Sequence, residues 1–489
     1  MYIPYPERIP YAWATTFASA LFAVQLFERT QLPFALCCFA FIMVATAAFN
    51  IAGGLYRPAG AYVFFNAILT LILGLVVKAA LGEPAHTNLA APQVTIEVYL
   101  FGAVAMLFGA CVERRFRPPQ AFIERKLPMP NLRTAYIGAT FIALFLRVIY
   151  ILNSTGAISG SFFQTIYNAD HFLPFALILG VMYTIRSSNG QRSVTPWLLF
   201  LFALSTGEGL LSFSKQALFS PAFCWVLGAA ICRYRLKLFN VLVLTIVVYV
   251  AYAYATPYSQ YGRVYQQGSG FNNIRVAGYL LTHMDEVVRE NAITTTGTYG
   301  KLAYYSHSVG LFDRLQMLSP DDALVSVTDQ YGFFGFEPLK EGAESAIPRI
   351  LWPGKPFAYF GNAYGHEVGA ITDEDMSTSV SFGVSADAYH EAGFSGVLLV
   401  EPLCMAAVFL IFSWFLGDVR GHPAVIVAIL ICAHTAPEGG IPGLFSLTEI
   451  TEYMILLALA CKYVLPIVGS IFDLEDTVSA VPKHALGTN

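Results

Sequence analysis

Long apolar runs alternate with short polar connections along most of this chain. A helix needs about 20 predominantly apolar residues to cross a bilayer, and twelve runs approach that length, the sixth and eighth being short. The pattern therefore predicts about twelve transmembrane helices. They are expected near residues 11–28, 33–50, 60–82, 95–112, 134–152, 171–185, 196–213, 217–231, 238–255, 394–416, 423–442 and 448–470.

One stretch breaks this pattern, because residues 256–393 contain no clear span over 138 residues. Loops longer than about 15 residues without secondary structure are usually functional or disordered. This stretch is too rich in aromatic and aliphatic residues for disorder, so we expect a functional helical segment there. The predicted organisation is nine spans in 1–255, a large external segment in 256–393 with the active site, and three spans and a tail in 394–489.

Composition supports a membrane protein. Of the 489 residues, 56% are hydrophobic and 12% are charged, and the mean hydropathy is +0.58. Soluble domains have about 25% charged residues, which excludes an ordinary water-soluble enzyme. The 28 basic and 32 acidic residues leave a net charge of −4, which gives no reason to expect a nucleic-acid partner. We therefore predict an all-α integral membrane protein.

The distribution of Lys and Arg predicts the orientation, because short loops rich in these residues stay in the cytoplasm. The connections on one side carry fourteen of them, whereas those on the other carry only Arg29 and Lys215. Both termini are therefore expected in the cytoplasm and residues 256–393 outside. The fourteen are Arg8, Arg57, Arg114, Arg115, Arg117, Arg125, Lys126, Arg133, Arg186, Arg192, Arg233, Arg235, Lys237 and Arg420.

The external segment has eight basic and sixteen acidic residues, so any role for its cations must be local. Apolar residues at helical spacing predict a helix over 271–291. On this helix Arg275 and Arg289 are fourteen residues apart and would share one face. They could bind an anionic substrate. A plain amphipathic helix with its arginines paired to Glu286 or Glu290 explains the pattern as well.

A second apolar stripe predicts a helix over 302–315. His307 and Arg314 would lie two turns apart on one face of this helix, with Gly310 between them. An imidazole that can act as a base beside a guanidinium suits chemistry on a phosphate-bearing substrate. A surface histidine and an ordinary contact between Arg314 and Asp313 remain the alternative.

The string Ile-Pro-Arg-Ile-Leu-Trp-Pro-Gly-Lys-Pro occupies residues 347–356. Three prolines and a glycine in ten residues exclude a helix or a central strand. They predict a stiff loop that presents Arg349, Trp352 and Lys355, where arginine offers a planar fork to phosphate and lysine a point charge. The alternative is an interfacial loop that Trp352 and Lys355 anchor at the headgroup level.

Charges inside predicted spans are costly and tend to be functional. Arg147, Glu208 and Glu401 are of this kind, and they could equally be ion-coupling residues of a transporter.

No metal site or cofactor is predicted. Asp373, Glu374 and Asp375 are interpreted as a solvated loop. The pairs His366-Glu367 and His390-Glu391 lack the i,i+4 partner of a zinc-binding helix.

The chain resembles the Wzy-type oligosaccharide repeat-unit polymerases of O-antigen and exopolysaccharide pathways. Its many spans with one large late external segment are similar to that family, and so is the 347–356 string, which resembles the pattern Pro-Arg-x-x-Trp-Pro-x-Lys-Pro. Asp387-Ala388-Tyr389, followed by Gly393 and Gly396, resembles an acid-x-aromatic element followed by Gly-x-x-Gly. The chain departs from the family in having Asp387 where Glu is commoner and Glu391-Ala392 where Asn/Asp-Phe is usual.

The resemblance implies a glycosyltransferase C-like fold in the bacterial inner membrane with a periplasmic active site. The growing glycan would move from undecaprenyl pyrophosphate to an incoming lipid-linked unit, without a nucleotide sugar or a metal. Membrane lipids, a flippase and a chain-length regulator are the implied partners. The expected catalytic residues are His307, Arg314 and Asp387, and the expected pyrophosphate and glycan contacts are Arg349, Lys355, Arg275, Arg289 and Trp352.

Three other functions compete with this one. An O-antigen ligase would use the same donor with a different acceptor. A secondary transporter or flippase would have inverted repeats with paired broken helices, and no paired halves are visible. A lipid-phosphosugar-dependent transferase would carry an acidic metal motif in its first external loop, which residues 28–32 lack.

Overall fold

The computed structural model describes residues 2–129, 131–154, 170–265, 270–290, 302–307, 309–347, 352, 360–376 and 378–472. Within these residues the secondary structure is helical, apart from two isolated β-bridges. The all-α prediction is confirmed for this part of the chain.

Seven helices are long and apolar enough to cross a membrane, and each coincides with a predicted span. The structure is thus that of a helical membrane protein. The seven are α2 (Leu32–Ala52), α3–η2–α4 (Pro58–Leu81), α5 (Pro92–Phe116), α7 (Leu132–Ser154), α12–η3–α13 (Leu238–Tyr265), η6–α20–η7 (Gly396–Leu416) and α22 (Gly440–Tyr463).

The other five predicted spans are also apolar helices, but they have only 15 to 17 residues. Their length is below the usual span of about 20 residues. They are α1 (Tyr11–Phe27), α9 (Phe172–Ser187), α10 (Pro196–Leu211), α11 (Lys215–Ile231) and α21 (Ala424–Glu438).

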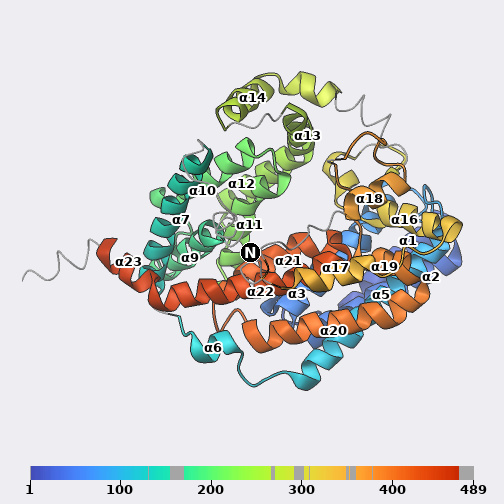
Figure 1. Cartoon of the computed structure of the whole chain (residues 1–489), viewed down its shortest axis with the longest axis horizontal. Coiled ribbons are helices and arrows are strands. Elements are labelled where there is room, and N and C mark those ends of the chain that lie inside the picture. Colours follow the sequence, from blue (N-terminus) through green and yellow to red (C-terminus); the bar gives the residue numbers. More distant parts are fainter. Residues whose placement is uncertain are drawn as a thin grey trace, which may run out of the picture.

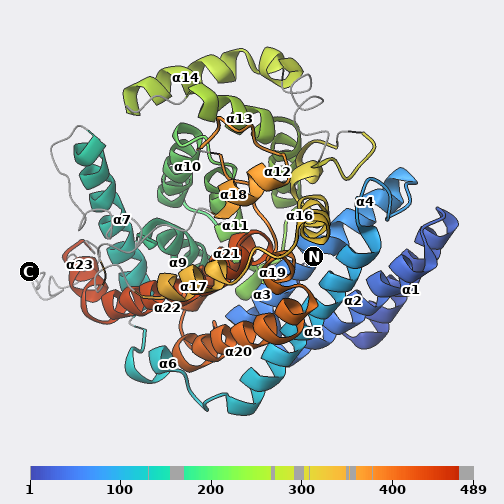
Figure 2. The same ribbon diagram turned by 45° about the vertical axis from the view of Figure 1, so that its right-hand side comes forward.

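The helices form two groups that α21 and α22 connect (Figures 1 and 2). In one group α5 packs against α2 and α20, and α1 packs against α2. In the other, α9 contacts α7, α10 and α11. The short helices α6 (Phe122–Lys126) and α23 (Leu465–Phe472) lie at the ends of spans, α23 against α7.

Small residues allow the first group to pack closely. Ala45, Ala48 and Ala52 of α2 are buried, and a Cβ added at Gly109 of α5 would lie 3.0 Å from the Cβ of Met405 in α20. In lipid, helix association depends on such close contact because the bilayer is as apolar as the side chains.

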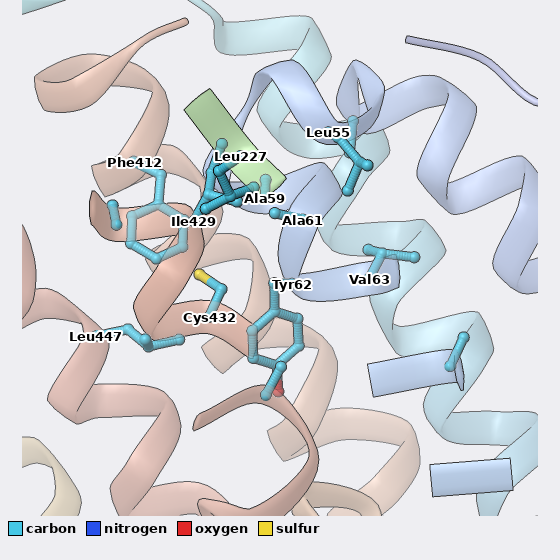
Figure 3. Close-up of a cluster of buried hydrophobic side chains, with 14 of the residues drawn as sticks. Leu55, Ala59, Ala61, Tyr62, Val63, Leu227, Phe412, Ile429, Cys432 and Leu447 are labelled. Carbon is cyan, nitrogen blue, oxygen red and sulfur yellow. The ribbon is translucent and has the colours of Figure 1, made fainter. Parts of the chain in front are cut away.

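The core continues where α3 (Pro58–Ala67) meets α21 and α22 (Figure 3). Tyr62, Cys432 and Leu447 are buried there. Tyr62 also packs edge-to-face on Phe409 of α20, with ring centroids 5.7 Å apart. The two groups of helices therefore share one continuous apolar core.

The described part of the predicted external segment is built from short helices. Two of them, α16 and α19, pack against α5, and α17 and α19 pack against α22. These three helices are therefore integrated into the main core, whereas α14 packs against α10 and α13 in a second apolar cluster. The elements of the described part are α13 (Thr256–Tyr265), which continues the span that α12 begins, α14 (Gly270–Thr282), η5 (Gly310–Arg314), α16 (Leu318–Tyr331), α17 (Glu337–Ser345), α18 (Phe360–Glu367) and α19 (Val384–Ala392).

The predicted helix over 302–315 is wrong. Residues 303–307 are not helical, and η5 is a single turn of 3₁₀ helix. Asp313 accepts hydrogen bonds from the backbone amide of Val309 at 2.9 and 3.1 Å, and Gly310 has a φ of +63°. This local turn ends the helical periodicity, so His307 and Arg314 do not share a helix face.

The predicted helix over 271–291 is confirmed in part, because a bend at His283 divides it. Helix α14 ends at Thr282, and residues 284–290 are helical again. Nδ1 of the His283 ring donates a hydrogen bond at 3.0 Å to the carbonyl of Tyr279, and the ring stacks on that of Tyr279, with centroids 4.3 Å apart. Arg275 and Arg289 are exposed on the two sides of this bend, so helical spacing alone does not place them on one face.

Candidate active site

The sequence-predicted site residues that the structure describes lie in different elements. His307 is exposed in a bend, Trp352 is 37% exposed, and Arg275 and Arg289 are exposed. Arg314 ends η5. Arg349 and Lys355 lie outside the described residues. Asp387, by contrast, is fully buried.

The bend that carries His307 is fixed to the connection between α4 (Leu73–Leu81) and α5. Glu83 accepts hydrogen bonds from the amide of Ser306 at 3.2 Å and pairs with the ammonium of Lys78 at 2.8 Å. Asn88 donates to the carbonyl of Tyr304 at 3.0 Å. His307 therefore has a defined backbone position, although its side chain is exposed.

Helix α19 buries an unusual number of ionisable groups for its nine residues. It is packed between α5, α16 and α22, and its N-cap is Gly383. Asp387, His390 and Glu391 are 0%, 2% and 1% exposed. Buried charges must be paired or neutralised, so the partners of these three groups define what the site can do.

Asp387 uses both carboxylate oxygens. It accepts a hydrogen bond from the hydroxyl of Tyr364 in α18 at 2.8 Å and one from the amide of Ile441 at 2.7 Å. Ile441 lies in the first turn of α22, whose free amides need acceptors. A Cβ at Gly440 would come within 2.6 Å of this carboxylate. Burial raises the pKa of Asp387 to about 6.

His390 connects α19 to α16 and α18. Its Nδ1 is 2.8 Å from the hydroxyl of Thr328, and its Nε2 is 3.1 Å from a carboxylate oxygen of Glu367, without hydrogen-bond geometry. Phe334 and Tyr364 enclose the imidazole, with ring centroids at 5.3 and 4.8 Å. Burial lowers the pKa of His390 to about 4, which favours the neutral ring.

Glu391 is a buried acid without a hydrogen-bond partner among the described residues. The amide of Leu339 in α17 approaches it without reaching hydrogen-bond geometry. Burial, followed by the nearby charge of Asp387, raises the pKa of Glu391 to about 8. Glu391 is therefore mainly a neutral carboxylic acid at pH 7.

Two aspartates of α16 complete this acidic cluster. Asp321 accepts from the hydroxyl of Tyr99 and from the amide of Gly383, both at 2.7 Å. Asp322 accepts from the backbone at the start of α5. Together with Asp387, these carboxylates hold the first turns of α5, α19 and α22, where the helix dipole favours negative charge.

The helices before and after the proline-rich string lie beside this cluster. Before it, α17 packs on α22, where a Cβ at Gly342 would lie 2.9 Å from the ring of Phe445. After it, Phe360 opens α18 and packs against Phe334 and Tyr364. Figure 2 shows α17, α18 and α19 in this region.

Several residues of the cluster were missed by the sequence interpretation. The pairs His366-Glu367 and His390-Glu391 were tested only against a zinc pattern, which they do not fit. The sequence did contain one sign of their role, because His390 and Glu391 follow shortly after Asp387 of the acid-x-aromatic element. Nothing in the sequence marks Thr328, which lies 62 residues from His390.

The charges predicted inside spans do not form one network, since Arg147 and Glu208 pair with each other whereas Glu401 contacts α19. Arg147 of α7 pairs with Asp170 and, at 2.7 Å, with Glu208 of α10. Glu401 of α20 accepts from the hydroxyl of Ser385 at 2.9 Å. Among the described residues no group of three or more His, Cys, Asp or Glu side chains is arranged to hold a metal ion.

Comparison with known proteins identifies no relative, because no family model, curated protein or solved structure matches this chain. The class of protein that the fold defines is a helical membrane protein with a buried acid and histidine cluster.

Proposed function

We propose that the chain is a glycosyltransferase that polymerises oligosaccharide repeat units carried on undecaprenyl pyrophosphate. The reaction takes place at the outer leaflet of the bacterial inner membrane. The growing glycan leaves its lipid pyrophosphate and joins a hydroxyl of the incoming unit. About twelve spans, of which five are short, and both termini in the cytoplasm belong to this proposal.

One observation carries the proposal. Asp387, selected from the sequence by its resemblance to a polymerase element, is fully buried. It lies in one cluster with protonatable groups, and Tyr364 of α18, which follows the 347–356 string in the chain, donates a hydrogen bond to it. The two elements of the resemblance are 30 to 40 residues apart in sequence, and the proposal requires that they meet at one active site.

The chemistry assigns roles to the charged residues. The leaving group is a pyrophosphate, so fixed cations stabilise the charge that develops as the glycosidic bond breaks. We assign this role to Arg349 and Lys355, with Arg314 as a further cation. Arg275, Arg289 and Trp352 are assigned to the glycan and lipid pyrophosphate. The acceptor hydroxyl needs a base, and no metal is required.

The test uses the bacterium that carries this gene. Deletion should leave a surface glycan of a single repeat unit, and the wild-type gene should restore the ladder of chain lengths. Arg349→Ala should fail to restore it at normal membrane abundance, because losing one such donor costs about 10²–10³ in rate. The matched control is Lys340→Ala, which removes an exposed cation of the same segment that pairs with the neighbouring Glu337 at 3.2 Å.

Two alternatives give different results in the same strains. A ligase would leave full-length polymer on the lipid carrier when deleted. A transporter is favoured by the Arg147 network between α7 and α10, since charges within spans commonly serve ion coupling. Deletion of a transporter would trap repeat units on the cytoplasmic face, out of reach of an external glycosidase.

A further inference from the structure

We propose that Glu367 is the base that takes the proton of the acceptor hydroxyl, and that His390 positions it. This inference rests on the proposed function and replaces the exposed His307 as the expected base. Glu367 is assigned as the catalytic residue. His390 acts through Glu367 and is a positioning residue.

The hydroxyl of Thr328 is 2.8 Å from both the carbonyl of Leu324 and Nδ1 of His390. When its single hydrogen goes to Leu324, the hydroxyl accepts from His390 and Nδ1 carries the hydrogen. Nε2 then presents a lone pair to the oxygen of Glu367, 3.1 Å away.

The contact between Nε2 and Glu367 lies at ion-pair distance but lacks the geometry of a hydrogen bond. Two lone pairs at this distance repel, so the imidazole disfavours the carboxylate form of Glu367 and favours its neutral acid. Burial raises the pKa of Glu367 and lowers that of His390, so the proton belongs on Glu367 beside a neutral imidazole. Loss of this proton creates the carboxylate that acts as the base.

Exposure supports the division of roles. The Glu367 side chain is 35% exposed, whereas that of His390 is 2% exposed. A sugar hydroxyl can therefore reach Glu367 from the aqueous side, while the histidine stays enclosed by aromatic rings. His390 is thus shielded from water, whereas Glu367 is accessible to it.

Other ionisable groups around the pair come from each neighbouring helix. They include Tyr364 and His366 from α18, Asp387 and Glu391 from α19, and Asp329 from α16, which accepts a hydrogen bond from Tyr389 at 2.6 Å. Burial is the cause that raises the pKa of Glu367.

The transfer step balances as follows. The O–H bond of the acceptor breaks and its proton moves to the Glu367 carboxylate. The acceptor oxygen forms a bond to the anomeric carbon, and the bond from that carbon to the lipid pyrophosphate breaks with its electron pair on the leaving oxygen. The exposed side of Glu367 then returns the proton to water.

The experiment uses the full chain in liposomes, supplied with lipid-linked repeat units extracted from the deletion strain. Polymer formation is measured from pH 5 to 9. The wild-type kcat should rise with pH and level off as Glu367 loses its proton. Glu367→Gln should lower kcat by about 10²–10⁴, leave KM within about twofold and abolish the rising limb. The matched control Glu374→Gln, the same change in an exposed loop, should keep both.

His390→Gln separates positioning from simple support of the fold. Without the imidazole lone pair beside it, the Glu367 carboxylate is destabilised less, so the rising limb should move to lower pH while KM is kept. Melting of each variant in detergent reports folding independently.

Two results overturn the inference. One is a Glu367→Gln enzyme that keeps the wild-type kcat and its rise with pH. The other is a rise of kcat with pH that is lost in His307→Ala and retained in Glu367→Gln. A wild-type chain that makes no polymer from these units refutes the proposed function itself.

Discussion

The contact between Asp322 and the start of α5 allows a quantitative test of how the cluster supports the membrane helices. Asp322 is 3% exposed. Its carboxylate accepts hydrogen bonds from the amides of Ala90 and Ala91, the latter at 3.1 Å, and from the hydroxyl of Thr95 at 2.8 Å. Ala91 is the N-cap of α5 and has no side-chain oxygen of its own, so Asp322 supplies the cap from another helix.

The magnitude follows from these bonds. A hydrogen bond to a charged group contributes about 1.5–3 kcal/mol, so the two backbone bonds provide about 3–6 kcal/mol before costs. Burial raises the pKa of Asp322 despite its hydrogen bonds, which means that desolvation offsets part of this gain. Asp322→Ala removes the acceptor and leaves the amides unpaired, so we expect a loss of about 3 kcal/mol in the free energy of unfolding.

Asp329 on the same helix is the matched control. It is exposed and accepts one hydrogen bond, from the hydroxyl of Tyr389 at 2.6 Å. Asp329→Ala should therefore cost about 1 kcal/mol. The assay is unfolding of the full chain by SDS in mixed micelles, with helix content as the signal. Equal losses in the two variants, or a loss below about 1 kcal/mol for Asp322→Ala, would refute the capping argument.

Three further predictions follow from the fold. Burial raises the pKa of Asp321 to about 7. The contribution of this acid to stability is therefore complete below about pH 4 and is lost as the pH rises to about 7. The melting temperature should fall over this range in the wild type and less in Asp321→Asn. Gly396→Ala should destabilise the chain by about 1–3 kcal/mol, because its Cβ would lie 1.9 Å from a backbone oxygen of α19, whereas Gly207→Ala, with nothing within 4 Å, should be neutral or stabilising in the same SDS assay. A reporter tag at position 235 should be cytoplasmic and one at position 340 periplasmic, and a cytoplasmic tag at position 340 would contradict the orientation.

Much of the helical framework could be predicted from the sequence. All twelve apolar runs are helical, because a run of apolar residues with few charges is a local property that needs no knowledge of neighbours. The prediction was wrong where a local turn overrides the pattern. At 302–315 the apolar spacing is helical, yet the positive φ of Gly310 and the hydrogen bond from the amide of Val309 to the side chain of Asp313 form a local turn instead.

The candidate site was less predictable. Resemblance selected Asp387, but the sequence interpretation gave it a catalytic role without seeing that both of its oxygens are occupied by Tyr364 and Ile441. It also set aside His390 and Glu367, because the spacing of a zinc helix was the only pattern against which they were compared.

The sequence by itself determined that this is an all-α membrane protein, since hydropathy and helix length are sums over adjacent residues. Only the tertiary structure decided which acids are buried, which helix starts they hold and which imidazole nitrogen faces a carboxylate. Those properties depend on residues far apart in the chain: Asp322 is 232 residues from Ala90, and His390 is 62 from Thr328. The charge state of a buried acid is set by the groups that folding places around it, and the identity of those groups is not encoded in the local pattern.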